Sequence, residues 1–242
     1  MKYIISILFF CFFATLGFGQ TQFSKDTLSS PTGDVIITFI GHGSLLFEWQ
    51  GKKIYIDPSS RKADLYQFPK ADMIFVTHHH GDHCDPAALK ALTQDKTKTF
   101  MSSIAHEIWG QGMVLYPEQQ VSIDNVGITV VNAYNLVNKN DEGIPYHKEG
   151  ECNGYLFTLG NLRIYVAGDT ENTPEMKALK HIDAAFLPMK LPYTMNPEMV
   201  ADGAKGFKPK ILYPYHYDKS LLTELQERME NVTGVELRIK NN

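Results

Sequence analysis

The sequence predicts an α+β domain in which two β-sheets stack face to face and helices cover both outer faces, a four-layer αββα sandwich. Each half of the chain begins with short strand patterns and continues with strands and helices in alternation. Two β-rich halves with helices of their own imply stacked sheets with outer helices, not a doubly wound parallel sheet. The 242 residues are 43% hydrophobic and 21% charged, an ordinary globular composition that can bury one sizeable core.

Residues 1–19 have the pattern of a cleaved signal peptide. A lysine precedes an apolar run, Ile4–Leu16, and the small-x-small pattern Gly17-Phe18-Gly19 follows. The run has 13 residues, fewer than the ~20 that a membrane-spanning helix needs, although an uncleaved anchor is the alternative. We therefore expect an exported protein, periplasmic or secreted if the source is bacterial, with a loose leader at residues 20–33 and the main domain at 34–242.

Strand patterns dominate the first half of the chain. Gln50-Gly51-Lys52 predicts a hairpin turn between two of the strands. Asp85 and Pro86 open a helix that ends near Leu92, because aspartate caps a helix N-terminus well and proline suits its first position. The expected strands are Val35–Ile40, Leu45–Trp49, Lys53–Ile56, Met73–Val76, Thr99–Ser102 and Val114–Tyr116, with a second helix at Ile104–Trp109.

The second half alternates strands and helices in the same way. Gly160-Asn161 predicts another hairpin turn, and four apolar residues share one face of a helix over Ser220–Asn231. The other expected strands are Gln120–Ile123, Ile128–Ala133, Gly154–Thr158, Leu162–Ala167, Ala184–Leu187, Lys210–Tyr213 and Val235–Ile239, with helices at Pro174–Leu179 and Pro197–Ala204.

The strongest chemical signal is the segment Thr77-His78-His79-His80-Gly81-Asp82-His83, directly after the apolar strand Met73–Val76. Alternate residues of an extended loop share a face, so we expect His78 and His80 to point together and His79 to point away. A rigid strand end that delivers imidazoles and a carboxylate into one loop is how a metal site is built, and this ligand mixture suits zinc, iron or manganese. A polyhistidine-like surface patch is the alternative.

This segment resembles the signature of the metallo-β-lactamase superfamily, and further motifs follow in the family's order. They are Asn132-Ala133-Tyr134-Asn135, Ala167-Gly168-Asp169-Thr170 and Pro214-Tyr215-His216-Tyr217. Ile40-Gly41-His42-Gly43-Ser44 and Asp57-Pro58 are similar to the group of L-ascorbate-6-phosphate lactonase-like and uncharacterised metal-dependent hydrolases. The resemblance covers Asp34 to Ile239 and implies the metallo-β-lactamase fold.

The resemblance also implies a ligand set for two divalent metal ions, zinc in the first place, with manganese or iron as alternatives. His78, His80 and one further residue would hold the first ion. Asp82, His83 and His216 would hold the second, and Asp169 would bridge the two ions. Ions ~3.5–4 Å apart can share a hydroxide, so the implied reaction is hydrolysis by a metal-bound hydroxide without a serine or cysteine nucleophile.

Two more residues receive roles from the resemblance. Asp57 is similar to the family's inner aspartate, which orients a metal ligand, and an ordinary strand-end turn is its alternative. His42 is similar to a histidine at the mouth of the site, where it could donate a proton or contact the substrate, so Asp82 and His42 are the candidate catalytic residues. A hydrogen-bonded loop histidine is the alternative for His42.

One ligand is missing from the family pattern, because the stretch Asn132-Ala133-Tyr134-Asn135 lacks the usual histidine. His147 is available downstream, and the eleven residues between Asn135 and His147 can fold back over the site at little cost in closure entropy. We therefore expect His147 to complete the first metal site. The alternative is an exposed loop histidine with Asn135 or water as the ligand.

Taken together, the residues predict an exported metal-dependent hydrolase acting on a small-molecule ester, lactone, amide or phosphoester. A lipid-type phosphodiesterase and a non-catalytic metal-binding protein on the same fold are the alternatives. The net charge of −4 offers no basic excess for nucleic acid, and no stable membrane anchor is expected. Cys84 and Cys152 could pair or stay free, and Tyr146, Tyr193, Tyr215 and Tyr217 are candidates to line a pocket.

Overall fold

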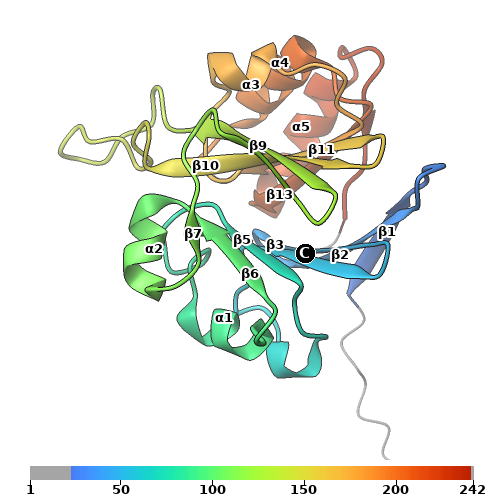
Figure 1. Cartoon of the computed structure of the whole chain (residues 1–242). Helices are drawn as coiled ribbons and strands as arrows, with labels where there is room; N and C mark the ends of the chain where they lie inside the picture. Colours follow the sequence, from blue (N-terminus) through green and yellow to red (C-terminus); the bar gives the residue numbers. More distant parts are fainter. Residues whose placement is uncertain (1–22, 241–242) are drawn as a thin grey trace, which may run out of the picture.

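Two seven-stranded sheets stack face to face in the computed structural model of the chain, and helices cover both outer faces (Figure 1). This arrangement confirms the predicted four-layer αββα sandwich. The structure describes residues 23–240, so the expected signal peptide at 1–19 lies outside the described residues. Within 23–240, no helix is long and apolar enough to cross a membrane.

The first sheet has the strand order β1-β2-β3-β4-β5-β6-β7. Strands β1 to β4 pair antiparallel, and β4 to β7 pair parallel. The strands are β1 (Ser24–Leu28), β2 (Val35–Gly41), β3 (Ser44–Trp49), β4 (Lys52–Ile56), β5 (Met73–Val76), β6 (Lys98–Met101) and β7 (Met113–Val114). The helices of this half are η1 (Leu65–Gln67), α1 (Pro86–Leu92) and α2 (Ser103–Trp109).

The second sheet has the order β14-β13-β12-β11-β10-β9-β8, antiparallel from β8 to β11 and parallel from β11 to β14. Its strands are β8 (Gln120–Ile123), β9 (Val126–Ala133), β10 (Cys152–Leu159), β11 (Leu162–Val166), β12 (Ala184–Met189), β13 (Ile211–Tyr217) and β14 (Glu236–Leu237). Its helices are α3 (Pro174–Ala178), α4 (Pro197–Phe207), η2 (Lys219–Leu221) and α5 (Leu222–Met229).

The expected loose leader at residues 20–33 is wrong over part of its length, because Ser24–Leu28 forms β1. This strand pairs in register with β2, from Ser24 opposite Phe39 to Leu28 opposite Val35. Its polar composition follows from its place at the edge of the sheet, where only Leu28 is buried.

The cap predicted for the first α-helix is present in the structure. The Asp85 side chain accepts hydrogen bonds from the backbone N–H groups of Ala87 and Ala88, and Pro86 occupies the first turn. The other carboxylate oxygen of Asp85 accepts hydrogen bonds from the backbone and hydroxyl of Ser60. This carboxylate therefore fixes the start of α1 against the loop after β4.

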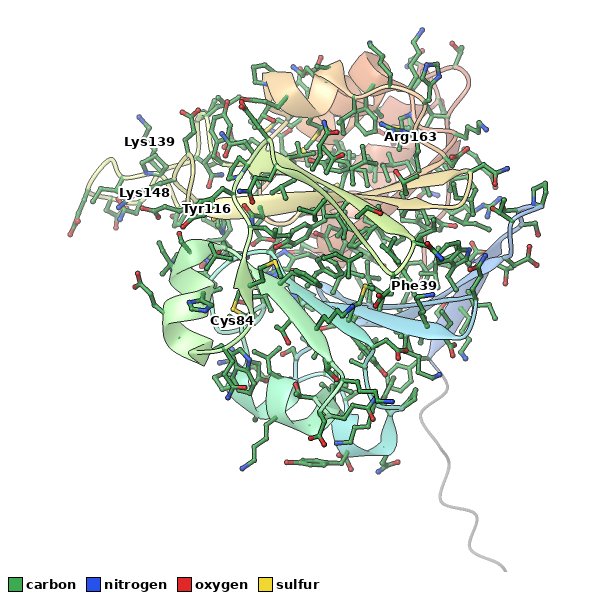
Figure 2. All side chains as sticks on the ribbon, viewed as in Figure 1. Phe39, Cys84, Tyr116, Lys139, Lys148 and Arg163 are labelled. Carbon is green, nitrogen blue, oxygen red and sulfur yellow. The ribbon has the colours of Figure 1, made fainter. Side chains whose placement is uncertain are left out.

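The core lies in three layers. Aromatic side chains from both sheets fill the space between them, and the Phe186 ring packs against Phe39 and Phe47 with centroids 5.9 and 5.7 Å apart. Figure 2 shows side chains filling this space, with Phe39 labelled between the sheets. Two further apolar clusters lie between each sheet and its own helices. The two sheets are thus held as one packed body.

The direction of the strands explains where the chemistry gathers. Strands β2, β4 and β5 run in one direction in the first sheet, and β9, β11 and β13 run together in the second. The carboxyl ends of these strands and the loops that follow them carry every residue that the sequence singles out as a metal ligand. Parallel strands bring such loops to the same edge of a sheet.

Candidate metal centre

Three histidines from two loops form the first group of candidate ligands. His78 and His80 follow β5, and His147 lies in the long loop before β10. His80 Nδ1 lies 3.1 Å from His78 Nε2 and 3.2 Å from His147 Nε2. The structure therefore places His147 against His78 and His80, with its side chain 1% exposed.

A second group gathers His42, Asp82, His83 and His216. Asp82 Oδ2 lies 2.9 Å from His42 Nε2, 3.5 Å from His216 Nε2 and 3.8 Å from His83 Nε2. The His42 and His216 rings pack with their centroids 3.8 Å apart. The structure thus brings His42 into contact with Asp82 and His216.

Asp169, from the loop after β11, lies between the two groups. Its Oδ2 is 3.5 Å from His147 Nε2 and 3.7 Å from His216 Nε2, and its Oδ1 is 3.5 Å from His83 Nε2. One carboxylate therefore faces both groups, which is the position that a bridging ligand needs. His79 belongs to none of the ligand groups found among residues 23–240.

Asp57 fixes the orientation of two histidines in the cluster. Its carboxylate accepts hydrogen bonds from His83 Nδ1 at 2.8 Å and from the backbone and hydroxyl of Thr77 at 2.7 Å each. Because the Thr77 hydroxyl donates to Asp57, the same oxygen accepts from His78 Nδ1 at 2.9 Å. Both imidazoles therefore carry hydrogen on Nδ1 and direct Nε2 to the cluster.

Buried atoms without partners show that the cluster fits metal ions. His83 Nε2, His216 Nε2 and Asp169 Oδ1 are buried and have no hydrogen-bond partner among the described residues. Buried polar atoms are normally paired, so this unpaired set leaves ligand atoms available for an ion. Imidazole nitrogens with carboxylate oxygens are ligands for zinc and for manganese or iron.

The charge state of the cluster also suits cations. Burial lowers the pKa of His78 and His80, and lowers that of His147 to about 4, so these imidazoles are neutral at neutral pH. Burial alone would raise the pKa of Asp82 and Asp169, but the histidines around them lower both. Neutral imidazoles and ionised carboxylates are the forms that bind metal.

His83 differs from the other buried imidazoles. Burial alone would lower its pKa, but the carboxylates of Asp169 and Asp57 raise it to about 9. The neighbouring carboxylates therefore favour a proton on this ring in the metal-free protein, and a metal ion at His83 Nε2 competes with that proton.

Glycine is required where β2 turns into β3. A Cβ atom at Gly43 would lie 2.9 Å from His83 Cε1 and 3.2 Å from His83 Nδ1. The preceding His42 has φ of 56°, in the left-handed region. This tight turn lets the backbone pass directly over the His83 ring.

The other predictions around the site have different outcomes. The prediction that Tyr215 lines a pocket is wrong, because this side chain is fully buried in the core between the sheets. Tyr146 and Tyr193 are neighbours with ring centroids 5.0 Å apart. Cys84 and Cys152 are free, buried thiols, so they do not form the disulfide that the sequence left open.

The sequence missed one buried residue near the site, Glu171, which follows Asp169 by two positions. Its side chain is fully buried, and it accepts hydrogen bonds from the loop that begins at Asn135. Nothing in the sequence marks this glutamate, since its partners are mainly backbone N–H groups of a segment more than thirty positions away.

Comparisons with known proteins identify the family of the chain. The profile of a β-lactamase superfamily domain matches residues 36–216. A metal-dependent hydrolase of Desulforamulus reducens is 31% identical over 191 residues, covering 75% of this chain and 84% of that protein. Another, from Thermococcus kodakarensis, is 32% identical over 199 residues, covering 76% of this chain and 85% of that protein.

Solved structures have the same fold. A crystal structure from Parabacteroides distasonis, described as a candidate metal-dependent hydrolase, is 42% identical, with a TM-score of 0.86 over 90% of this chain and 99% of that one. A metallo hydrolase of the archaeon Ignicoccus hospitalis has a TM-score of 0.68 at 24% identity, over 86% of this chain and 95% of that one. The second likeness is one of fold alone.

Proposed function

The chain belongs to the β-lactamase superfamily and is a metal-dependent hydrolase, and from this premise we propose that it hydrolyses a small-molecule ester, lactone, amide or phosphoester. The observation that carries the proposal is the meeting of two ligand groups at Asp169, with buried ligand atoms left unpaired among the residues that the structure describes. His78, His80 and His147 would hold one divalent ion, and Asp82, His83 and His216 would hold another, with Asp169 between them.

Two divalent ions, zinc in the first place, would polarise the scissile carbonyl or phosphoryl group and lower the pKa of water at the site. The residues of the chain supply the rest. Asp169 faces both ligand groups, and Asp57 keeps His83 in the tautomer that can coordinate. Because these side chains are already in place, the protein does not have to rearrange when the substrate reacts.

The substrate would approach from the side of Asp82, the most exposed carboxylate of the cluster. The Asp82 side chain is 32% exposed and that of His42 is 13% exposed, whereas His78 and His83 are fully buried. His42 Nε2 donates to Asp82 Oδ2, because a carboxylate only accepts. In its imidazolium form, His42 would donate the proton that the leaving oxygen or nitrogen takes up, and would return to the neutral imidazole that is hydrogen-bonded to Asp82.

A lipid-type phosphodiesterase is the second candidate, favoured by apolar surface in the loops beside the cluster. Leu136 and Val137, after β9, are 46% and 67% exposed, and Leu191 and Tyr193, after β12, are 46% and 43% exposed. The contact between the Tyr146 and Tyr193 rings joins the two loops. Exposed apolar side chains gathered at a site favour a substrate with an acyl or aromatic group.

We place the reaction outside the cytoplasm, on the pattern of residues 1–19. The substrate would then be an extracytoplasmic compound, and export would deliver the enzyme to it.

Turnover with measured metal content tests the proposal. Purified protein is loaded with Zn²⁺ and assayed with a chromogenic phosphodiester, a panel of lactones and carboxylic esters of increasing acyl length. Hydrolysis that disappears after chelation and returns with Zn²⁺ supports the proposal. A rate that rises with acyl length selects the lipid-type candidate. Full metal loading without turnover of any substrate class would leave the non-catalytic metal-binding alternative.

A further inference from the structure

We propose that Glu171 is a positioning residue for the metal centre, acting through Asn135 on His147. The Glu171 side chain is fully buried but belongs to none of the candidate ligand groups in the described part of the chain. The inference rests on the proposed function only where it treats His147 as a metal ligand. The hydrogen bonds that carry it belong to the metal-free protein.

The Glu171 carboxylate is surrounded by donors from the loop after β9. Oε2 accepts hydrogen bonds from the backbone N–H groups of Leu136 and Val137, at 2.8 Å each. Oε1 accepts from the backbone N–H of Asn138 at 2.7 Å and from Asn135 Nδ2 at 3.2 Å. Three successive backbone groups therefore converge on one buried carboxylate, which holds this loop against the segment that carries Asp169.

The second step runs through the amide of Asn135. Its Nδ2 donates to Glu171 Oε1 and to the carbonyl oxygen of Tyr193 at 2.9 Å, and both partners can only accept. The amide orientation is thus fixed, with Oδ1 facing His147. Oδ1 accepts from the backbone N–H of His147 at 2.8 Å and from its Nδ1 at 2.9 Å.

The result is a defined tautomer of His147. Because Asn135 Oδ1 can only accept, the imidazole hydrogen lies on Nδ1 and the Nε2 lone pair faces the cluster. That Nε2 lies 3.2 Å from His80 Nδ1 and 3.5 Å from Asp169 Oδ2. Glu171 and Asn135 thereby fix the histidine that takes the place of the one missing from the family pattern.

Glutamine cannot replace Glu171 without loss. Each carboxylate oxygen accepts two donors, so a glutamine amide at this position would point its NH₂ group at two N–H donors in either orientation. Glu175→Gln is a matched control, since Glu175 lies four residues later and accepts only from the hydroxyl of Tyr134 among the described side chains, at 3.2 and 3.4 Å.

The test uses the whole protein with ¹⁵N-labelled histidine. In the metal-free wild type, we expect His147 as the Nδ1–H tautomer by NMR. In Glu171→Gln we expect a mixture of tautomers, and Zn²⁺ affinity lower by about 10–100-fold, the usual effect of losing a residue that orients a metal ligand. Glu175→Gln should match the wild type in both measurements.

A folded Glu171→Gln protein with the wild-type His147 tautomer and Zn²⁺ affinity would overturn the inference. If Glu171→Gln does not fold, Asn135→Ala replaces it, and an unchanged tautomer and affinity there overturn the inference equally. The NMR measurement needs neither metal nor substrate. A tautomer shift in a protein that fails to hydrolyse any substrate would therefore support the positioning role while the proposed function fails.

Discussion

Replacing Asp57 by asparagine should invert the tautomer of His83. The backbone N–H of Thr77 can only donate, so the amide oxygen of an asparagine must take the place of Asp57 Oδ1, 2.7 Å from that group. The amide NH₂ then faces His83 Nδ1, which lies 2.8 Å from Asp57 Oδ2 in the wild type. To accept this hydrogen bond, His83 must carry its hydrogen on Nε2, the atom that faces Asp169.

The expected magnitude follows from the bonds that change. A protonated Nε2 cannot bind metal, so we expect Zn²⁺ affinity to fall by about 10–100-fold, or roughly 1.4–2.7 kcal/mol. The hydrogen bonds that His83 and the Thr77 hydroxyl make to a charged carboxylate are also weakened. We expect the free energy of unfolding of the metal-free protein to fall by about 2–3 kcal/mol.

Competition titration with a zinc chelator measures the affinity, urea denaturation measures the stability, and ¹⁵N NMR of histidine in the metal-free protein, at a pH above the His83 pKa of about 9, reports the tautomer of the neutral ring. Asp72→Asn is the control, because Asp72 likewise accepts a backbone N–H, that of Lys53 at 2.8 Å, but precedes β5 at the opposite end of that strand. Wild-type Zn²⁺ affinity in Asp57→Asn, with His83 still protonated on Nδ1, would refute the reasoning.

The remaining predictions concern the ligands, an ion-pair network and export. Asp82→Ala and Asp169→Ala should each abolish hydrolysis while circular dichroism stays native, and wild-type turnover in either would contradict the two-ion site. Burial alone would raise the pKa of Asp26, but hydrogen bonds from Lys240 and other groups lower it below its ordinary 3.8. Its ionised form therefore stabilises the fold above pH 3.8, and this contribution is lost as the pH falls through the lower folded-state pKa. Asp26→Asn should cost about 1 kcal/mol of unfolding free energy at pH 7 and progressively less below about pH 4, and urea denaturation at both pH values tests this. N-terminal sequencing of protein from its native host should find the first residue at or near Gln20, whereas a retained Met1 in the membrane fraction would indicate an anchor.

Local patterns predicted the buried elements well. Met73–Val76 has the bounds that the sequence predicts, because a short apolar run between polar residues has one way to be buried. The helix that follows Asp85 is also predicted to its last residue, since its cap and its first proline act within a single turn. The edge strand Ser24–Leu28 was missed because a single buried side chain gives no alternating pattern.

The candidate site was predictable only in part. Its ligands follow strands, and their order along the chain marks them, so His78 and His216 could be named without a structure. The contacts of Glu171 could not, because they are made by backbone groups whose position depends on the path of the loop after β9. Tyr215 precedes the candidate ligand His216, and the sequence did not show that the Tyr215 ring points into the core between the sheets.

The ligand groups come from both sheets, and this has a consequence for how the two halves of the molecule hold together. His78, Asp82 and His83 belong to the half ending at β7, whereas His147 and Asp169 belong to the half starting at β8. A bound ion would therefore link the two halves. By mass action, its binding free energy would add to the free energy that holds the halves together. If the chain were cut between β7 and β8, metal affinity would report how well the two fragments reassemble.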